Sequence, residues 1–152
     1  MPATAHHIAD LLPRVRKADH DEFAVSCSGT VENGLRLGLL ISQQAYAGVT
    51  KGGVVAITGL YKPTLTCNFG VPWMVGSVTL EDRRIQKHFM RASRSVLGKY
   101  LADAGRLENW VDSRNTVAIR WLRQLGFTIH PATLYGPKKM MFHRFEIGGT
   151  DV

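Results

Sequence analysis

The segment from Asn115 to Phe127 constrains the fold most, because it predicts a helix together with both of its ends. Asn115 can cap the first turn, and apolar residues follow at helical spacing. Gly126 can take the left-handed conformation that ends a helix, and a hydrophobic residue comes directly after it. The flanking segments 107–112 and 128–134 both have the composition of strands. The sequence therefore places a helix between two strands in this region.

The remaining segments predict a mixed sheet with helices packed on it. Helices are expected over 31–44 and 83–101, and two short ones are expected between His6 and about Cys27, broken at Pro13. Strands are expected over 46–49, 54–61, 69–75, 107–112, 128–134 and 140–147. The paired glycines in the turn 50–53 can take the positive φ of a hairpin turn, so the first two strands should pair.

Several residues near the amino terminus have expected structural roles. Asp19 is suited to cap the second short helix, and Thr30 is suited to cap the helix that follows. Gly34 and Gly38 lower the helix propensity of 31–44, but they allow another part of the chain to pack closely against it.

The predicted helix 83–101 is amphipathic and basic. Its apolar residues fall on one side at about 100° per residue, and these are Ile85, Phe89, Ala92, Val96 and Tyr100. The opposite side carries Arg84, Lys87, Arg91 and Arg94. Residues 77–152 contain thirteen basic and seven acidic side chains, whereas residues 1–76 contain six and five. Such a basic stripe either binds an anionic partner or is the solvated face of the helix.

Composition predicts one soluble domain over residues 1–152. The chain is 45% hydrophobic and 20% charged, with a net charge of +7, and no repeat or linker divides it. Cys27 and Cys67 lie far apart, which argues against a disulfide framework and a zinc knuckle, and no metal site is expected. The amino terminus lacks the apolar core of a signal peptide, and no apolar run is long enough to span a membrane. Neither secretion nor membrane insertion is expected.

The order of elements, together with the motif Asn115-x-x-Ala118-Ile119 that ends in Leu125-Gly126-Phe127, resembles the GNAT acetyltransferase fold and its fourth-helix motif. Other segments resemble a bacteriophage family of small GNAT-like proteins that includes the internal virion protein A type of short-tailed phages. These segments are 72–76, 89–94, 107–112, 120–122, 135–137 and 142–143. The resemblance implies an α/β fold of three layers, α/β/α, with a central mixed and mostly antiparallel sheet.

The chemistry of the GNAT fold can be compared with this chain residue by residue. Active GNAT enzymes hold the pyrophosphate of acetyl-CoA in a glycine-containing loop between a strand and the following helix. The corresponding interval here, 76–84, has no paired glycines, and Glu81 and Asp82 would repel a pyrophosphate. The tyrosine that usually serves as the general acid falls on Leu122, which cannot donate a proton. Standard acetyl transfer is therefore not expected, and neither is a bound cofactor.

The residues that could still carry out acetyl transfer each have a structural alternative. Asp112 and Glu108 could act as a general base through water, although Asp112 is equally suited to cap the turn before Asn115. Asn115 could contact the pantetheine of CoA, but its capping role alone explains it. Arg91 and Arg94 could replace the missing phosphate contacts, or they could lie on a solvated helix face.

Other reactive or aromatic side chains are expected to be structural. Cys67 could be paired with His143 or His130 as a nucleophile, but no nucleophile motif surrounds it, and a small buried residue is the better interpretation. The tryptophans lie on apolar elements, where a place in the core or at an interface is expected.

The main hypothesis from the sequence is a phage-encoded GNAT-fold protein that lacks standard acetyl transfer and acts as a virion-associated or host-directed interaction component. Its expected partners are phage virion or host proteins, in the virion or the host cytoplasm, bound through Arg84, Lys87, Arg91 and Arg94. The alternative is an acetyl-CoA-dependent N-acetyltransferase with an atypical cofactor loop. A homo-oligomer and a nucleic-acid partner are further alternatives, and the net charge alone would attract a nucleic acid.

Overall fold

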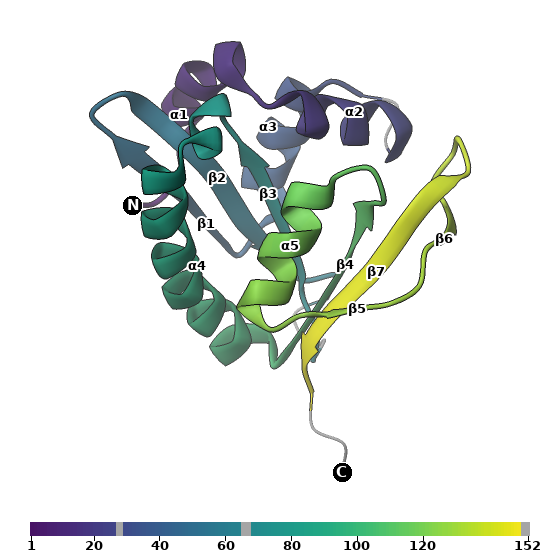
Figure 1. Cartoon of the computed structure of the whole chain (residues 1–152). Coiled ribbons are helices and arrows are strands. Elements are labelled where there is room, and N and C mark those ends of the chain that lie inside the picture. The colour runs from purple at the N-terminus through teal and green to yellow at the C-terminus, as the bar shows by residue number, and fades with distance from the viewer. Residues whose placement is uncertain (27–28, 65–67, 150–152) are drawn as a thin grey trace.

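Two antiparallel sheets lie between two layers of helices in the computed structural model, which describes residues 1–26, 29–64 and 68–149 (Figure 1). The helices are α1 (Ala5–Leu11), α2 (Lys17–Ser26), α3 (Val31–Ile41), α4 (Arg83–Ala104) and α5 (Thr116–Leu125), with short 3-10 turns η1 (Leu12–Arg14) and η2 (Val78–Glu81). The strands are β1 (Gln44–Thr50), β2 (Gly53–Tyr61), β3 (Val71–Gly76), β4 (Arg106–Asp112), β5 (Thr128–Ile129), β6 (Thr133–Tyr135) and β7 (Met140–Gly148).

The first sheet has the order β1-β2-β3 and begins with the predicted hairpin. Gly53 has φ +109°, a conformation that side chains with a Cβ rarely adopt, and it opens β2 directly after the turn. β3 pairs with β2 in antiparallel register, with Val75 opposite Ile57. The hairpin and the third strand are confirmed, with β3 shifted slightly from the expected 69–75.

The second sheet has the order β4-β7-β5, and β6 pairs with the other part of β7. The strand expected over 128–134 is interrupted at 130–132, so that β5 and β6 each pair with β7 separately. Pro131 lies in this interruption, and its missing N–H cannot contribute to a ladder.

The two sheets meet where Gly70 and Leu107 form a parallel bridge. The Gly70 N–H donates to the Arg106 carbonyl at 2.8 Å, and the Glu108 N–H donates to the Gly70 carbonyl at 3.0 Å. Among the described residues, β3 and β4 share no ladder beyond this point, and they separate toward Gly76 and Asp112. The sheet is thus mixed and mostly antiparallel, as expected, and its two halves are joined at one end only.

The helices cover both faces of the sheets, which confirms the three-layer architecture. One core packs α1 and α3 on the first sheet, and it includes Ile8, Leu11, Leu35, Ile57 and Val75. Another packs α4 and α5 against the other face, and it includes Tyr100, Leu107, Ile119, Phe127 and Phe145. None of the helices in the described parts of the chain is long and apolar enough to cross a membrane.

The ends of α3 and α5 follow the predicted capping. The Thr30 hydroxyl accepts a hydrogen bond from the Asn33 N–H at 3.2 Å, and the Asn115 side chain accepts one from the Ala118 N–H at 3.3 Å. Gly126 has φ +100° and ends α5. α3 stops at Ile41, earlier than expected.

The glycines of α3 allow close packing, as predicted. A Cβ at Gly38 would lie 2.8 Å from the Trp73 ring, and a Cβ at Gly34 would overlap the Phe23 ring. The Trp73 Nε1–H donates to the Ser42 hydroxyl at 2.8 Å just after the helix ends. Gly34 and Gly38 therefore receive two aromatic side chains that a larger residue would displace.

The buried side of α4 differs from the prediction at one position. Ala92 was expected on the apolar side, but it is exposed, and Met90 is buried instead. The reason is that α4 packs against both the sheet and α5, where Met90 joins a cluster with Trp121. The buried arc of the helix is therefore turned toward α5.

Candidate functional site

The beginning of α2 lies across the end of β3, where β3 and β4 separate. Val15 forms an isolated antiparallel bridge with Ser77, and the Arg16 N–H donates to the Gly76 carbonyl at 3.0 Å. The Asp19 carboxylate accepts a hydrogen bond from the Gly76 N–H at 2.8 Å. Both backbone polar groups of the last residue of β3 are thus bonded to the α2 segment.

A buried ion pair holds this segment in place. The Arg16 guanidinium donates to the Asp19 carboxylate through Nη2 at 2.9 Å and Nε at 3.1 Å, and their side chains are 8% and 5% exposed. The guanidinium also lies 5.0 Å from the centre of the Trp121 ring. Asp19 was expected to cap α2, but it lies within the helix and bonds to Arg16 and Gly76 instead. Arg16 is a local partner three residues away, whereas the Gly76 amide is supplied only by the tertiary fold.

The same helix is bonded to the end of β4 through Glu22. Its Oε1 accepts hydrogen bonds from the Asp112 N–H at 3.1 Å and from the Asn115 side-chain amide at 3.0 Å. Burial is the main reason that the pKa of Glu22 is raised to about 7. The nearby Asp19 and Asp112 carboxylates raise this pKa further, whereas the two hydrogen bonds lower it. We call Arg16, Asp19 and Glu22 the α2 latch, because the Arg16 backbone and the two carboxylates bond to the separated ends of β3 and β4.

Sequence reasoning missed Arg16 and Glu22 as parts of the site. A signal was present, because Arg16, Asp19 and Glu22 recur at intervals of three and therefore fall on one side of a helix. Charged residues on the sheet-facing side of a helix need buried partners. The sequence alone does not show that those partners are strand ends on β3 and β4.

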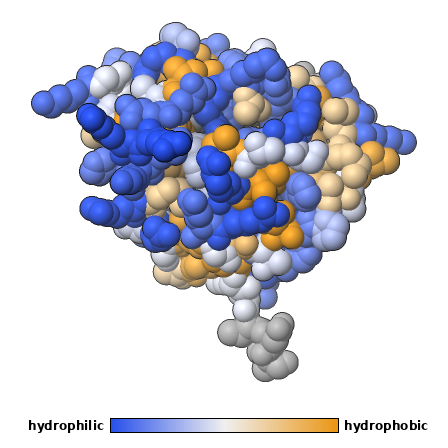
Figure 2. Space-filling model, in the orientation of Figure 1, coloured by the Kyte–Doolittle hydropathy of each residue, from blue (hydrophilic) through white to orange (hydrophobic). Residues whose placement is uncertain are grey.

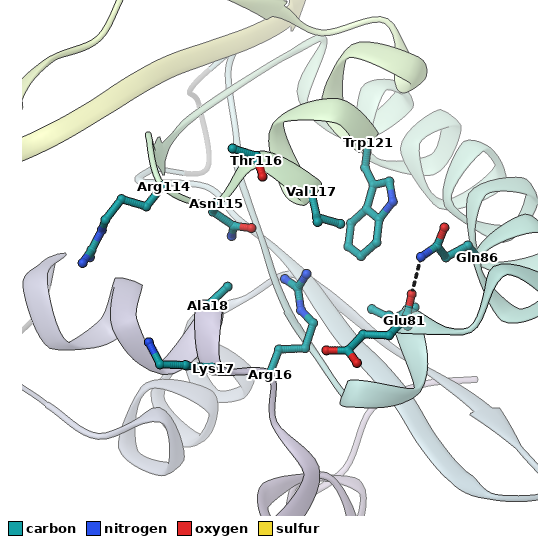
Figure 3. Close-up of a pocket in the computed structure, with 11 residues that line it drawn as sticks. Arg16, Lys17, Ala18, Glu81, Gln86, Arg114, Asn115, Thr116, Val117 and Trp121 are labelled. Atoms are coloured by element: carbon teal, nitrogen blue, oxygen red, sulfur yellow. Dashed lines mark hydrogen bonds between the residues drawn. The ribbon is translucent and has the colours of Figure 1, made fainter.

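A hollow of about 370 Å³ lies beside the latch, between η2 and the beginnings of α4 and α5 (Figure 3). Its charged lining residues come from different elements, with Arg16 and Lys17 near α2, Glu81 on η2, and Arg114 before α5. The apolar part of the wall is formed by Ala18, Leu80, Val117 and Trp121. Figure 3 shows the Arg16 side chain extending into the space between Asn115 and Glu81.

The cations around the hollow already have carboxylate partners. Lys17 pairs with Asp21 at 2.8 Å, and Arg114 pairs with Asp112 at 2.6 Å. Arg16 is held by Asp19. These pairs leave little positive charge free to attract an anion into the hollow.

The loop that would hold a pyrophosphate is closed by its own residues. Asp82 accepts a hydrogen bond from the Arg84 N–H at 2.8 Å, so a carboxylate already occupies the amino terminus of α4. The Gln86 side chain donates to the Leu80 carbonyl at 2.7 Å, as the dashed line in Figure 3 shows. Leu80 is buried on Gly76, where a Cβ would lie 2.6 Å from its Cδ1. The residues present therefore do not fit the phosphates of acetyl-CoA.

The structure separates the two carboxylates that the sequence proposed as a general base. Asp112 is 2% exposed and accepts a hydrogen bond from the Arg114 N–H at 2.8 Å, which is the turn-capping role. Burial raises the pKa of Asp112, but the hydrogen bonds and charge of Arg114 outweigh burial and hold it below its usual value. Glu108 lies four residues earlier on β4, about 13 Å along the strand, and pairs with Arg106 and Arg144 at 3.3 and 3.4 Å.

The proposed cofactor ligands are also placed apart. Asn115 is 5% exposed, and its amide group is used by the α5 cap and by Glu22. Arg91 and Arg94 lie on the exposed side of α4, and neither lines the hollow in the described part of the structure. Leu122, at the position of the usual tyrosine, packs against the hydrophobic core between α5 and the second sheet.

The histidines and the tryptophan considered in the sequence analysis bond to or pack against neighbouring residues of the fold. The His143 Nδ1 lies 2.7 Å from the His130 carbonyl, and the His130 Nε2 lies 3.2 Å from the Glu146 carboxylate. Trp121 packs against Phe89 at 5.3 Å between ring centres. Cys27 and Cys67 lie outside the described residues.

The basic stripe is exposed as expected. Arg84, Lys87, Arg91 and Arg94 all lie on the solvent side of α4. Figure 2 shows strongly hydrophilic side chains gathered over α4, beside a more apolar region over the middle of the molecule.

Comparison with known proteins gives structural matches and no sequence match. No model of a known protein family matches the chain. No curated protein matches it either. A ribosomal-protein-S5-alanine acetyltransferase from Vibrio fischeri is 12% identical, covering 99% of this chain and 92% of that one, with a TM-score of 0.71. A ribosomal-protein-alanine N-acetyltransferase from Brucella melitensis is 14% identical, covering 98% of both chains, with a TM-score of 0.67.

A third structure, a GNAT-family acetyltransferase from Bacillus anthracis, is 10% identical, covering 97% of this chain and 92% of that one, with a TM-score of 0.70. At these identities the similarity concerns the fold. The chain thus has the GNAT acetyltransferase fold over nearly its whole length, and its second helix is bonded to the ends of both β3 and β4.

Proposed function

We propose that this chain is a GNAT-fold protein that lacks standard acetyl transfer and acts by binding another protein. The observation that carries the proposal is the α2 latch. Arg16, Asp19 and Glu22 occupy hydrogen-bonding groups at the ends of β3 and β4, beside the hollow.

A ligand that entered between the strands would have to break these bonds. Displacing α2 would expose or unpair the buried Arg16–Asp19 pair, and an unpaired buried charge costs about 3–5 kcal/mol. The side chain of Asp82 at the start of α4 adds repulsion toward a phosphate. Both costs act against cofactor binding before any chemistry can begin.

The specific form of the proposal follows the resemblance to the phage family. It places the protein in the virion or in the host cytoplasm, with a virion protein or a host protein as its partner. The exposed Arg84, Lys87, Arg91 and Arg94 support a docking surface, because they leave the core of the fold untouched. Mass spectrometry of purified phage particles would test the virion assignment, and absence of the protein from particles would contradict it.

Calorimetric titration with acetyl-CoA tests the loss of acetyl transfer. We expect no measurable heat of binding for the unchanged protein, while an active GNAT enzyme in the same buffer serves as the positive control. A dissociation constant in the low micromolar range, about −8 kcal/mol, would overturn the proposal.

One observation favours the alternative, an acetyl-CoA-dependent N-acetyltransferase. Glu22 has a pKa of about 7, and a carboxyl group of that kind can accept or release a proton near neutral pH. If the protein acetylates amines, Glu22→Gln should abolish the activity while Asp21→Asn on the same helix should not. If the unchanged protein acetylates no amine, the raised pKa of Glu22 reflects its surroundings in the fold and has no catalytic role.

A further inference from the structure

The outer surface of α4 and α5 is cationic across both helices. Seven exposed side chains form what we call the two-helix cationic face: Arg83, Arg84, Lys87, Arg91, Arg94, Arg120 and Arg123. α5 contains no acidic residue, and the one acid of α4, Asp103, lies in its last turn and pairs with Lys62 at 3.3 Å. The charges of this face are therefore not neutralised by carboxylates of their own helices.

The two helices contact each other, which brings the cations of α5 near those of α4. The Arg94 guanidinium donates to the Gln124 carbonyl at 3.4 Å, which places the middle of α4 beside the end of α5. Phe89 of α4 also packs against Trp121 of α5, with 5.3 Å between ring centres. Arg123 precedes Gln124 in the chain, so the end of α5 brings its cations close to those in the middle of α4. Figure 2 shows strongly hydrophilic side chains over α4, with both hydrophilic and apolar side chains over the middle of the molecule, where α5 lies.

We propose that the two-helix cationic face binds an acidic helix of a partner protein, an inference that rests on the proposed interaction function. The cations at 84, 87, 91 and 94 recur every three or four residues. Carboxylates on a partner helix recur at the same spacing when they share one face, so the two rows can be matched along their length. Arg120 and Arg123 add a second row, which the sequence analysis did not include.

The composition and the shape of the face both suit a helix of a partner protein. Six of the seven cations are arginines, which are enriched in protein interfaces and among their energetically dominant residues, whereas lysines are depleted there. Small side chains are exposed on the same helix at Ala92, Ser95 and Gly98, and a Cβ added to Gly98 would meet no atom within 4 Å. A partner backbone can therefore approach closely enough to remove water from the guanidinium groups.

Features that nucleic-acid sites use are turned away from this face. Trp121 is 5% exposed and its ring lies against Phe89 and Arg16, so it offers no platform on which bases could stack. The amino terminus of α4, where a phosphate would bind, is capped by Asp82. Charge remains the one feature that a nucleic acid could use.

The test compares two labelled probes of equal net charge: a synthetic acidic helix with Glu residues along one side, and a short DNA duplex. We expect the acidic helix to bind more tightly than the duplex at about 0.15 M salt. Arg120→Glu/Arg123→Glu should weaken that binding about tenfold or more. Lys138→Glu/Lys139→Glu, at the turn between β6 and β7, makes the same change in charge and should have little effect. Thermal unfolding of each variant checks that the fold is intact. We expect it to be intact because all four substituted side chains are exposed.

Several results would overturn the inference. Tighter binding of the duplex, with an affinity that falls steeply with salt and is lost on reversal of Arg120 and Arg123, would assign the face to nucleic acid. Failure of the acidic helix to bind, or binding that the α5 reversal leaves unchanged, would also reject it. These outcomes are distinct from failure of the proposed function, which would appear as acetyl-CoA binding in calorimetry with the unchanged protein.

Discussion

The α2 latch should make the stability of this protein depend on pH through Glu22. The ordinary pKa of 4.5 describes this carboxyl group in the unfolded chain, and burial raises its pKa to about 7 in the fold. The folded state therefore holds a proton that the unfolded state releases between these two pH values. This difference in pKa between the folded and the unfolded state contributes about 3 kcal/mol to the free energy of unfolding. This stability is present in full below pH 4.5 and is lost as the pH rises through about 7.

Glu22→Gln isolates this contribution. A glutamine keeps an oxygen that can accept from the Asp112 N–H and the Asn115 amide, but it carries no charge at any pH. We expect the variant to match the unchanged protein at pH 4.5 and to be more stable by up to about 3 kcal/mol above pH 7. Urea unfolding of both proteins across this range measures the difference.

Asp21→Asn provides the matched control, because Asp21 is on the same helix but belongs to an exposed pair with Lys17. The control should shift stability by less than about 1 kcal/mol at every pH. A constant difference between Glu22→Gln and the unchanged protein from pH 4.5 to pH 8 would refute the reasoning, because it would show that Glu22 does not titrate in that range.

Other substitutions test the remaining structural claims by denaturant unfolding. Asn115→Ala should lower stability by about 1–2 kcal/mol, because it removes both the α5 cap and the bond to Glu22; an unchanged stability with a lost acetylation activity would instead assign Asn115 to chemistry. Gly126→Val should cost about 1–3 kcal/mol, since φ is +100° there, and a neutral result would contradict that conformation. Asp19→Ala should cost about 3–5 kcal/mol, and adding Arg16→Met should recover part of the loss, whereas strict additivity would argue against a coupled pair.

Local sequence signals were enough to predict much of the fold. The ends of α5 and the β1–β2 hairpin depend on residues close to one another in the chain, so the cap at Asn115 and the left-handed Gly126 were predictable. The buried side of α4 was predicted less well, because the position of Met90 depends on packing against α5, which no local pattern contains.

The candidate site was the least predictable part, because it is made by contacts between distant segments. The motif comparison placed the ends of β3 and β4 close to their observed positions, and it predicted that a glycine-containing cofactor loop is absent. It could not show that Asp19 bonds to Gly76 or that Glu22 bonds to Asp112 and Asn115. These residues are ordinary helix positions in sequence, and only the path of the chain makes them part of the site.

The latch also has a consequence for how the two sheets open. The Gly76 and Asp112 amides belong to different sheets, yet both donate to carboxylates of α2. Local unfolding of that one helix would release both amides at once, so their hydrogen exchange should proceed through the same opening event and with the same free energy. At their separated ends, the two sheets would then form a single cooperative unit because a helix joins them, even though no strand ladder does.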